Sequence, residues 1–319
     1  MKTGDGTVGW IARKDRQVKF GLRIDDFNWP GGEREMGARL ESAGRRAEAA
    51  GFDSIWIWDH FVQLRKWEDP HPEGWMALAH LAGVTQRIML GTHVTGVTYR
   101  APAILVKQAT TLDVLSGGRA YLGIGAAWNE REHAAFGVPF PPLRERFEIL
   151  EETLQVALRA WAGETGPFDG KHIQLTEQID SPRPVQRPHP PILIGGVGER
   201  KTLRLVAQYA QATDMFISDP AEFRHKLDVL RRHCDDLGRP YEQIERHGRI
   251  DLSRPDGVEL PPGRLAPASL LLDRAEQMAR AGADAIVVSL PAITETDVIE
   301  RFGEDVVRPG HAIQRPAAA

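Results

Sequence analysis

The chain has 319 residues, and 40 basic against 44 acidic side chains leave a formal charge of −4, so no strong electrostatic field recruits nucleic acid or an anionic membrane. Its single cysteine, Cys234, excludes an intrachain disulfide and a cysteine-cluster metal site, which fits a reducing compartment. No apolar run approaches the length of a membrane span, and residues 1–16 lack the apolar stretch of a secretion signal, so we expect a cytoplasmic protein.

Short apolar runs rich in β-branched residues alternate along the chain with longer stretches of helical period, which is typical of repeated βα units. The predicted strands are residues 18–24, 54–58, 88–92, 120–124, 191–194, 214–217, 244–250 and 285–289, of which 244–250 has the weakest pattern. The predicted helices are residues 33–50, 102–115, 144–161, 199–209, 220–237, 269–281 and 295–307. Such units can build an open doubly wound sheet, but eight of them without a composition break favour an α/β fold of the (β/α)8 TIM barrel type.

The domain organisation follows from this pattern. We expect a single barrel over residues 18–307, with unpacked tails at 1–17 and 308–319. Residues 162–190, before the fifth strand, are rich in proline and predict an elaborated loop with a short hairpin at 171–175. A loop of this length usually covers a functional site.

The second predicted strand ends in a Trp-Ile-Trp-Asp-His run that closes with Asp59 and His60. In (β/α)8 barrels the reacting groups lie where strands end, so this junction is a candidate site. A histidine there can act as an acid or a base near neutral pH. The alternative is that His60 only holds a loop by hydrogen bonding.

Small or β-branched residues follow the third and fourth strands. The third strand leads through Thr92, His93 and Val94, and the fourth leads through a Gly-Ile-Gly sequence to Ala126. Such residues leave room for a flat ring to approach the backbone. Ordinary strand-end packing explains either stretch, taken alone, at least as well.

Polar side chains come next along the chain, where Asn129 and Glu130 could bond a cofactor or a substrate. The fifth strand is then followed by Gly195-Gly196-Val197-Gly198 and a helix. Free backbone N–H groups and the positive end of that helix favour a phosphate at the glycines. The alternative is a bare glycine turn.

The sequence lacks the patterns expected for dinucleotide binding by a Rossmann fold, for a metal site and for a serine nucleophile. The glycines after the fourth strand lack the third glycine of a dinucleotide fingerprint. The eleven histidines are scattered without paired-ligand spacing, so we assign no metal. No Gly-x-Ser-x-Gly elbow for a serine nucleophile is present.

Taken together, the junctions resemble the bacterial luciferase-like superfamily, and within it the deazaflavin-dependent branch that uses coenzyme F420. The stretches that carry the resemblance are residues 49–60, 109–119, 122–129 and 190–196. In the deazaflavin branch, some sugar-phosphate dehydrogenases carry an acidic residue where this chain has Trp128, with Glu130 two positions later. A sugar-phosphate substrate is therefore not expected.

The resemblance implies a role for each matching residue. His60 would face the reacting end of the ring, and His60 and Glu130 are the expected catalytic residues. His93 and Val94 would be joined by a non-prolyl cis peptide that supports the back of the ring, and residues 196–198 would hold the phosphate. The expected cofactor-binding residues are Asp59, Thr92, His93, Val94, Ala126, Asn129, Gly195, Gly196, Val197 and Gly198.

Three functions share these residues. The first is an oxidoreductase that transfers a hydride between coenzyme F420 and a small organic substrate, with His60 as the proton donor or acceptor. The second is an FMN-dependent luciferase-like monooxygenase that uses reduced flavin and oxygen. The third is a flavin-binding barrel without catalysis.

The expected partners are the small-molecule substrate and a second copy of the chain. Relatives pair through their second and third helices, which implies a homodimer. Leu78, Leu81 and Val84 form an apolar stripe in that region that could serve either the core or an interface.

Overall fold

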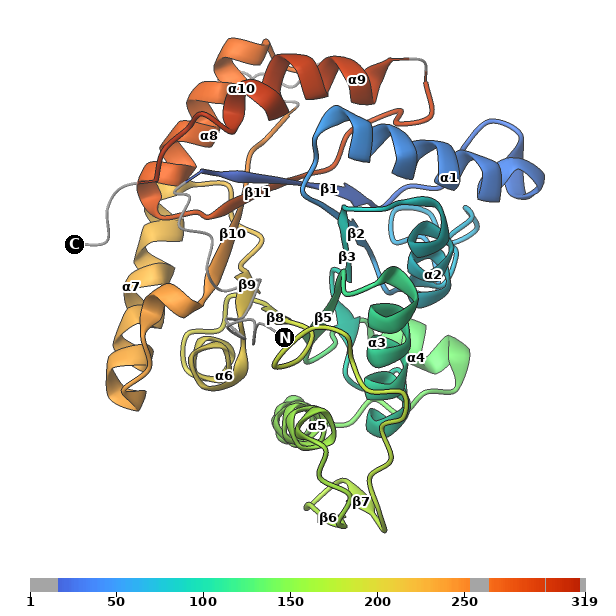
Figure 1. Cartoon of the computed structure of the whole chain (residues 1–319), viewed down its shortest axis with the longest axis vertical. Coiled ribbons are helices and arrows are strands. Elements are labelled where there is room, and N and C mark those ends of the chain that lie inside the picture. The colour runs from blue at the N-terminus through green and yellow to red at the C-terminus, as the bar shows by residue number, and fades with distance from the viewer. Residues whose placement is uncertain (1–16, 253–263, 296, 316–319) are drawn as a thin grey trace, which may run out of the picture.

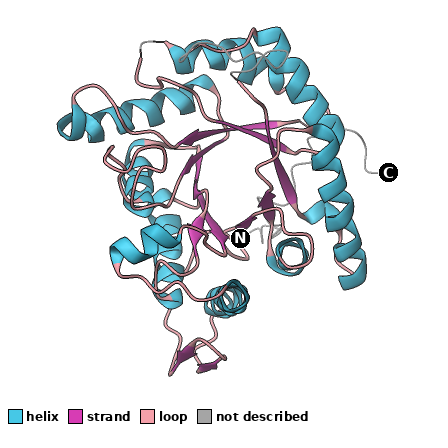
Figure 2. Ribbon diagram, turned by 180° about the vertical axis from the view of Figure 1, so that it is seen from behind, coloured by secondary structure: helices cyan, strands magenta, loops and turns pink. Residues whose placement is uncertain are grey.

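The computed structural model describes residues 17–252, 264–295 and 297–315. Its central feature is a ring of parallel strands surrounded by helices (Figures 1 and 2). The strands of the ring are β1 (Lys19–Ile24), β2 (Ser54–Ile57), β3 (Met89–Thr92), β5 (Ala120–Gly125), β8 (Ile192–Gly195), β9 (Ala212–Asp214), β10 (Glu245–Arg249) and β11 (Ala285–Val288).

The strand pairings close this ring. Their order is β3-β2-β1-β11-β10-β9-β8-β5, and β3 pairs in turn with β5. The two-residue strand β4 (Thr95–Gly96) continues the course of β3 and also pairs with β5. The structure is therefore a closed (β/α)8 barrel, as predicted, and not an open sheet.

Seven of the eight predicted strands are confirmed, including the weak one at β10, and the eighth shares only Asp214 with β9. The largest shift in position is at β9, which ends at Asp214, whereas a strand over 214–217 was expected. Phe216 has a φ of 58°, and this left-handed conformation interrupts the extended backbone.

The helices cover the outside of the ring (Figure 2). They are α1 (Gly32–Ala50), α2 (Gly74–Val84), α3 (Pro102–Ser116), α4 (Glu130–Phe136), α5 (Leu143–Ala162), α6 (Thr202–Tyr209), α7 (Pro220–Leu237), α8 (Ala268–Ala281) and α9 (Val298–Phe302), and the chain continues through a π-helical turn (Gly303–Val307) into α10 (Arg308–Gly310). The periodicity does not predict α2, which is apolar on most sides, or α4, which has only seven residues.

The segment before β8 carries the expected hairpin, formed by β6 (Phe168–Asp169) and β7 (Gln174–Leu175). It does not cover the carboxyl face of the barrel. Gln186 in this segment donates to the carbonyl of Ala120, at the amino end of β5. The expectation that the loop lies over a functional site is therefore wrong, because a connection from a helix into a strand runs at the opposite face.

The last described residues pack against the amino end of β1. Gly310 lies on the ring of Phe20, His311 Nε2 is 3.0 Å from Asp53 Oδ2, and the Val18 N–H donates to the Ile313 carbonyl. The prediction of an unpacked tail from residue 308 is therefore wrong as far as residue 315. Residues 1–16, the expected tail at the other end, lie outside the described residues.

In the described part of the chain, every helix is too short or too polar to cross a bilayer.

Candidate active site

A cavity of about 1010 Å³ lies at the carboxyl end of the barrel. Residues at or after the ends of β1, β9, β10 and β11 line it. Its charged lining consists of Arg23, Asp25, Asp26, Arg65, Arg249, Asp251, Arg264 and Glu295. A polar mouth at this face is the usual place for the reacting groups of a (β/α)8 barrel.

His60 stands at this face, after β2, and is held by a buried carboxylate. Its Nδ1 lies 2.7 Å from Oε2 of Glu132, and the Tyr99 hydroxyl donates to the same oxygen at 2.6 Å. The N–H of Phe61 donates to Oε1. Glu132 comes from the first turn of α4, whose N-cap side chain, Asn129, accepts from the N–H of Glu132. A short helix thus delivers the partner of His60.

The charges of this group follow from its hydrogen bonds. Burial would raise the pKa of Glu132, but the bonds from His60, Tyr99 and the Phe61 N–H outweigh burial and lower it. Burial, together with Glu132, raises the pKa of Tyr99, so its phenol stays protonated. Because a carboxylate only accepts hydrogen bonds, Nδ1 of His60 carries a hydrogen, and Nε2 is the nitrogen left to take up or release a proton.

Two tryptophans flank His60. The ring centroids of Trp58 and Trp128 lie 6.1 and 5.7 Å from that of the imidazole. Their planes make angles of 79° and 70° with the imidazole plane, so both contacts are T-shaped. Trp58 also lies under the guanidinium of Arg23, which lines the cavity. Trp58 therefore lies between His60 and Arg23 at the edge of the cavity.

Glu130, the expected catalytic carboxylate, is exposed at the start of α4. The carboxylate that contacts His60 is that of Glu132, because two positions on a helix differ by about 200° in direction. A catalytic role of Glu130 stays a prediction. One signal in the sequence could have identified Glu132. Asn129 followed three residues later by Glu132 matches the start of a capped helix.

Asp59 is held in place by an ion pair. Both of its oxygens accept from Arg100, at 2.6 and 2.8 Å, and the residue has no exposed surface. Arg100 in turn pairs with Glu73, the N-cap of α2. In this structure Asp59 pairs with Arg100 and fixes the loop that carries His60, and its contact with a cofactor stays a prediction.

The third junction contains the expected non-prolyl cis peptide between His93 and Val94. Thr92 and His93 themselves are buried, and Thr92 Oγ1 donates to the carbonyl of Gly123 inside the barrel wall. Neither side chain presents a surface to a cofactor, because both point into the packed interior. Val94 is half-buried and is the residue of this junction that reaches the mouth.

Glycines make room for Val94 on two neighbouring strands. A Cβ atom at Gly125 or Gly195 would stand 3.0–3.1 Å from a methyl group of Val94, closer than packed side chains normally approach. Ala126, just beyond β5, is likewise half-buried. Small residues therefore surround Val94, as the sequence of these junctions indicates.

The glycine loop after β8 is open. Gly196 has a φ of 133° and donates to the Asp214 carbonyl, Val197 is 44% exposed, and Gly198 is exposed. The side chain of Thr202 stands where a Cβ on Gly198 would go, and α6 begins at this threonine, later than predicted. Bare backbone ahead of a helix is suited to an anionic group.

The predicted junctions thus share one face of the molecule. Asp59, Val94 and Gly196 follow β2, β3 and β8, which are parallel members of one ring. The sequence did not point to Tyr99, Arg100 or Glu132, because each acts through a partner at least 27 positions away in the chain.

Comparisons with known proteins agree with the fold. Residues 18–253 match the sequence family described as luciferase-like monooxygenase. A protein of Kineococcus radiotolerans named F420-dependent glucose-6-phosphate dehydrogenase is 35% identical over 224 residues, covering 67% of this chain and 64% of that protein, which is less than two thirds of its length. A protein of the same name from Intrasporangium calvum is 33% identical over 259 residues, covering 77% of this chain and 75% of that protein.

Solved structures share the fold. The coenzyme F420-dependent tetrahydromethanopterin reductase of Methanopyrus kandleri has a TM-score of 0.75 at 19% identity and covers 92% of this chain and 99% of that chain. A monooxygenase from Streptomyces bottropensis has a TM-score of 0.74 at 19% identity, covering 92% and 100%. At these identities the likeness concerns the barrel alone.

Proposed function

Since the chain belongs to the luciferase-like monooxygenase family, we propose that it is an oxidoreductase that transfers a hydride between coenzyme F420 and a small organic substrate. The observation that carries the proposal is the His60–Glu132 pair beside the mouth of the barrel, which provides a proton donor or acceptor. The names of the relatives from Kineococcus and Intrasporangium favour F420 as the cofactor.

The residues at the mouth fit such a cofactor. Val94, packed against Gly125 and Gly195, presents a small-residue surface that a flat ring can approach. The open backbone at residues 196–198 suits the phosphate of the tail. Bound F420 would supply the carbon that gives or accepts the hydride.

The side chains of this protein would handle the accompanying proton. His60 would take or release it at Nε2 while Glu132 holds Nδ1 and stabilises the charged imidazole. Tyr99 keeps the Glu132 carboxylate in place, and Asp59 with Arg100 fixes the loop that carries His60. Trp58 and Trp128 would limit the access of water.

Substitution of His60 tests this proposal. We expect His60→Ala to lower turnover by about 10²–10⁴-fold, since the general acid–base group is lost, while F420 affinity changes little. Turnover is measured from F420 absorbance with a panel of alcohols and sugar phosphates, and affinity from fluorescence. His80→Ala, on the exposed face of α2, is the matched control and should leave both unchanged.

Other outcomes identify the alternatives. Tight binding of FMN in place of F420 would overturn the cofactor assignment and favour the monooxygenase. Binding of F420 without turnover of any substrate would favour a barrel that binds without catalysis. Unchanged turnover in His60→Ala would show that the assigned role of His60 is wrong.

We also propose that the protein is a cytoplasmic homodimer that pairs through α2 and α3. Leu78 and Leu81 are fully buried in the core and do not contribute. Exposed apolar side chains on these helices are Met76, Ile104 and Leu115. Light scattering of the purified protein measures the mass that tests this proposal.

A further inference from the structure

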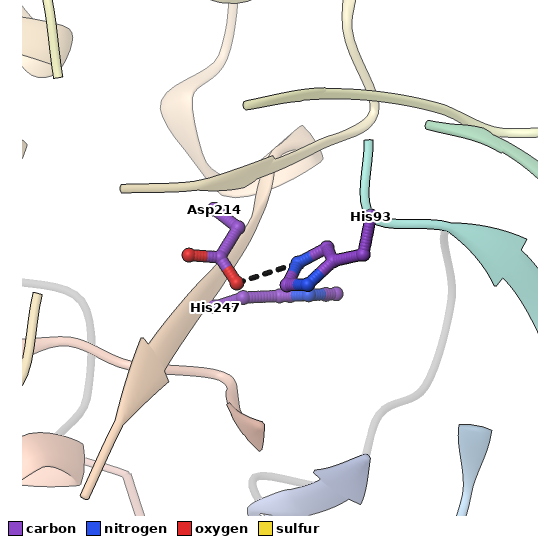
Figure 3. Close-up of side chains that lie close together, drawn as sticks. All are labelled: His93, Asp214 and His247. Carbon is purple, nitrogen blue, oxygen red and sulfur yellow. Dashed lines mark ion pairs between the residues drawn. The ribbon is translucent and has the colours of Figure 1, made fainter. Parts of the chain in front are cut away.

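Three side chains that commonly bind metals point toward one another (Figure 3). His93 follows β3, Asp214 ends β9 and His247 lies in the middle of β10. One ligand atom from each residue lies within 4.8 Å of the other two. The residues are only 3%, 0% and 1% exposed, so bulk solvent does not reach them.

Polar atoms in this cluster lack partners. Both ring nitrogens of His93, Oδ2 of Asp214 and Nδ1 of His247 make no hydrogen bond with any described residue. His93 Nε2 and Asp214 Oδ2 face each other 2.6 Å apart as an ion pair (Figure 3). Buried polar atoms are rarely left unpaired, and the ring nitrogens Nδ1 of His93 and His247 remain without a hydrogen-bond partner among the described residues.

The remaining polar atoms of the same side chains are engaged. Asp214 Oδ1 accepts the N–H of Phe216. His247 Nε2 lies 2.7 Å from Glu245, which is ion-paired with Lys19. The carboxylate of Glu245 places the hydrogen of His247 on Nε2, so Nδ1 presents a lone pair to the centre of the cluster. A carboxylate behind an imidazole in this way is the usual support of a metal-binding histidine.

The chemistry of the donors also suits a cation. Imidazole nitrogens and carboxylate oxygens are ligands that zinc prefers, and two histidines with one aspartate form a common set in which water takes the fourth position.

We propose that His93, Asp214 and His247 bind a divalent transition-metal ion, and that Zn²⁺ is the ion this ligand set suits best. The ion would connect β3 to β9 and β10 across the interior of the barrel. Trp56 and Phe216 lie beside His93 and shield the site, with ring centroids 5.2 and 5.5 Å away. This inference does not depend on the proposed cofactor or substrate.

One neighbouring charge opposes the ion. Arg249 Nε lies 3.8 Å from Asp214 Oδ1, and its positive charge competes with a metal for the same carboxylate. Removal of this charge in Arg249→Gln should therefore tighten metal binding. If His93 and Asp214 formed only a structural pair, the parent protein would bind no metal there, and Arg249→Gln would have no metal binding to strengthen.

Metal titration of the tag-free full chain tests the proposal. After treatment with a chelator, the protein should bind one equivalent of Co²⁺ with the visible absorption of a four-coordinate ion, and Zn²⁺ should displace it and raise the melting temperature. In His247→Gln, the affinity should fall by at least about 100-fold, and in Glu245→Gln by about 10–100-fold. His80→Gln, at the surface, should bind like the parent protein.

Two results would overturn the proposal: less than one equivalent bound by the parent protein at saturation, or the same affinity in His247→Gln as in the parent. Near-ultraviolet circular dichroism in the presence of chelator establishes whether His247→Gln is folded. If it is not folded, Arg249→Gln decides the question, because an unchanged Co²⁺ affinity in that variant contradicts the assigned site.

Discussion

At the scale of single residues, the site depends on one carboxylate that serves three donors. Glu132 accepts from His60, Tyr99 and the Phe61 N–H and has no exposed surface. Hydrogen bonds to a charged group are stronger than those between neutral groups. The orientation and tautomer of His60 therefore depend on the charge of Glu132.

This dependence predicts a pH-dependent stability difference. At pH 7, Glu132→Gln should lower the free energy of unfolding by about 1–3 kcal/mol, since charge-assisted bonds are lost in a buried place. The folded-state pKa of Glu132 is lowered, so its contribution is complete above the ordinary carboxyl pKa of about 4.3 and is lost as the pH falls through the folded-state value. Denaturant unfolding from pH 7 to pH 3 measures the difference.

Glu130→Gln is the matched control for this series. Glu130 is exposed two positions earlier on the same helix, so its substitution should change neither stability nor its pH dependence. A constant gap between Glu132→Gln and the parent protein at all pH values would contradict the role given to the Glu132 charge.

At the scale of elements, the sequence predicts the strands better than it predicts the connections. Most of the strands are visible as short apolar runs, although β10 contains no β-branched residue, and the glycines at the ends of β5 and β8 mark the junctions. The seven-residue α4 has too few turns for a periodic pattern. The cluster of His93, Asp214 and His247 is invisible to any spacing rule, because its members come from three strands more than 30 residues apart.

The cap of α4 provides a prediction at this scale. Asn129→Ala should cost about 1 kcal/mol, because the side chain accepts from the Glu132 N–H at the first turn. Since α4 positions Glu132, turnover should fall as well. Hydrogen exchange of the α4 amides and thermal unfolding measure the loss. Asn129→Asp, which keeps a capping oxygen, should retain the helix; equal losses in both variants would mean that Asn129 acts through something other than the cap.

At the scale of the whole molecule, the two ends of the described chain meet at the face opposite the site. β1 pairs with β11 to close the ring, and α10 then lies against β1 from below. Gln17 and Gln314 form an isolated antiparallel bridge. The amino face therefore carries contacts that stabilise the fold, while the carboxyl face carries the candidate chemistry.

A substitution at Gly310 separates these two properties. A Cβ atom there would overlap the Phe20 ring, so Gly310→Ala should lower the free energy of unfolding by about 1–3 kcal/mol. Ligand binding at the opposite face should not change. Gly37→Ala on α1 is the control, since no atom lies within 4 Å of its added methyl group and alanine favours a helix. A melting temperature equal in the two variants would contradict the close packing at Gly310.

The bridge between Gln17 and Gln314 bears on the order in which the segments of the barrel can follow one another along the chain. Because residues so distant in sequence are neighbours, a short linker could join them, and the polypeptide could be reopened between α7 and β10, near Gly238, without separating any βα pair. Such a circular permutant would contain the same eight βα units but would begin at a different one. The closed ring of strands, and not the position of the chain termini, then defines the architecture.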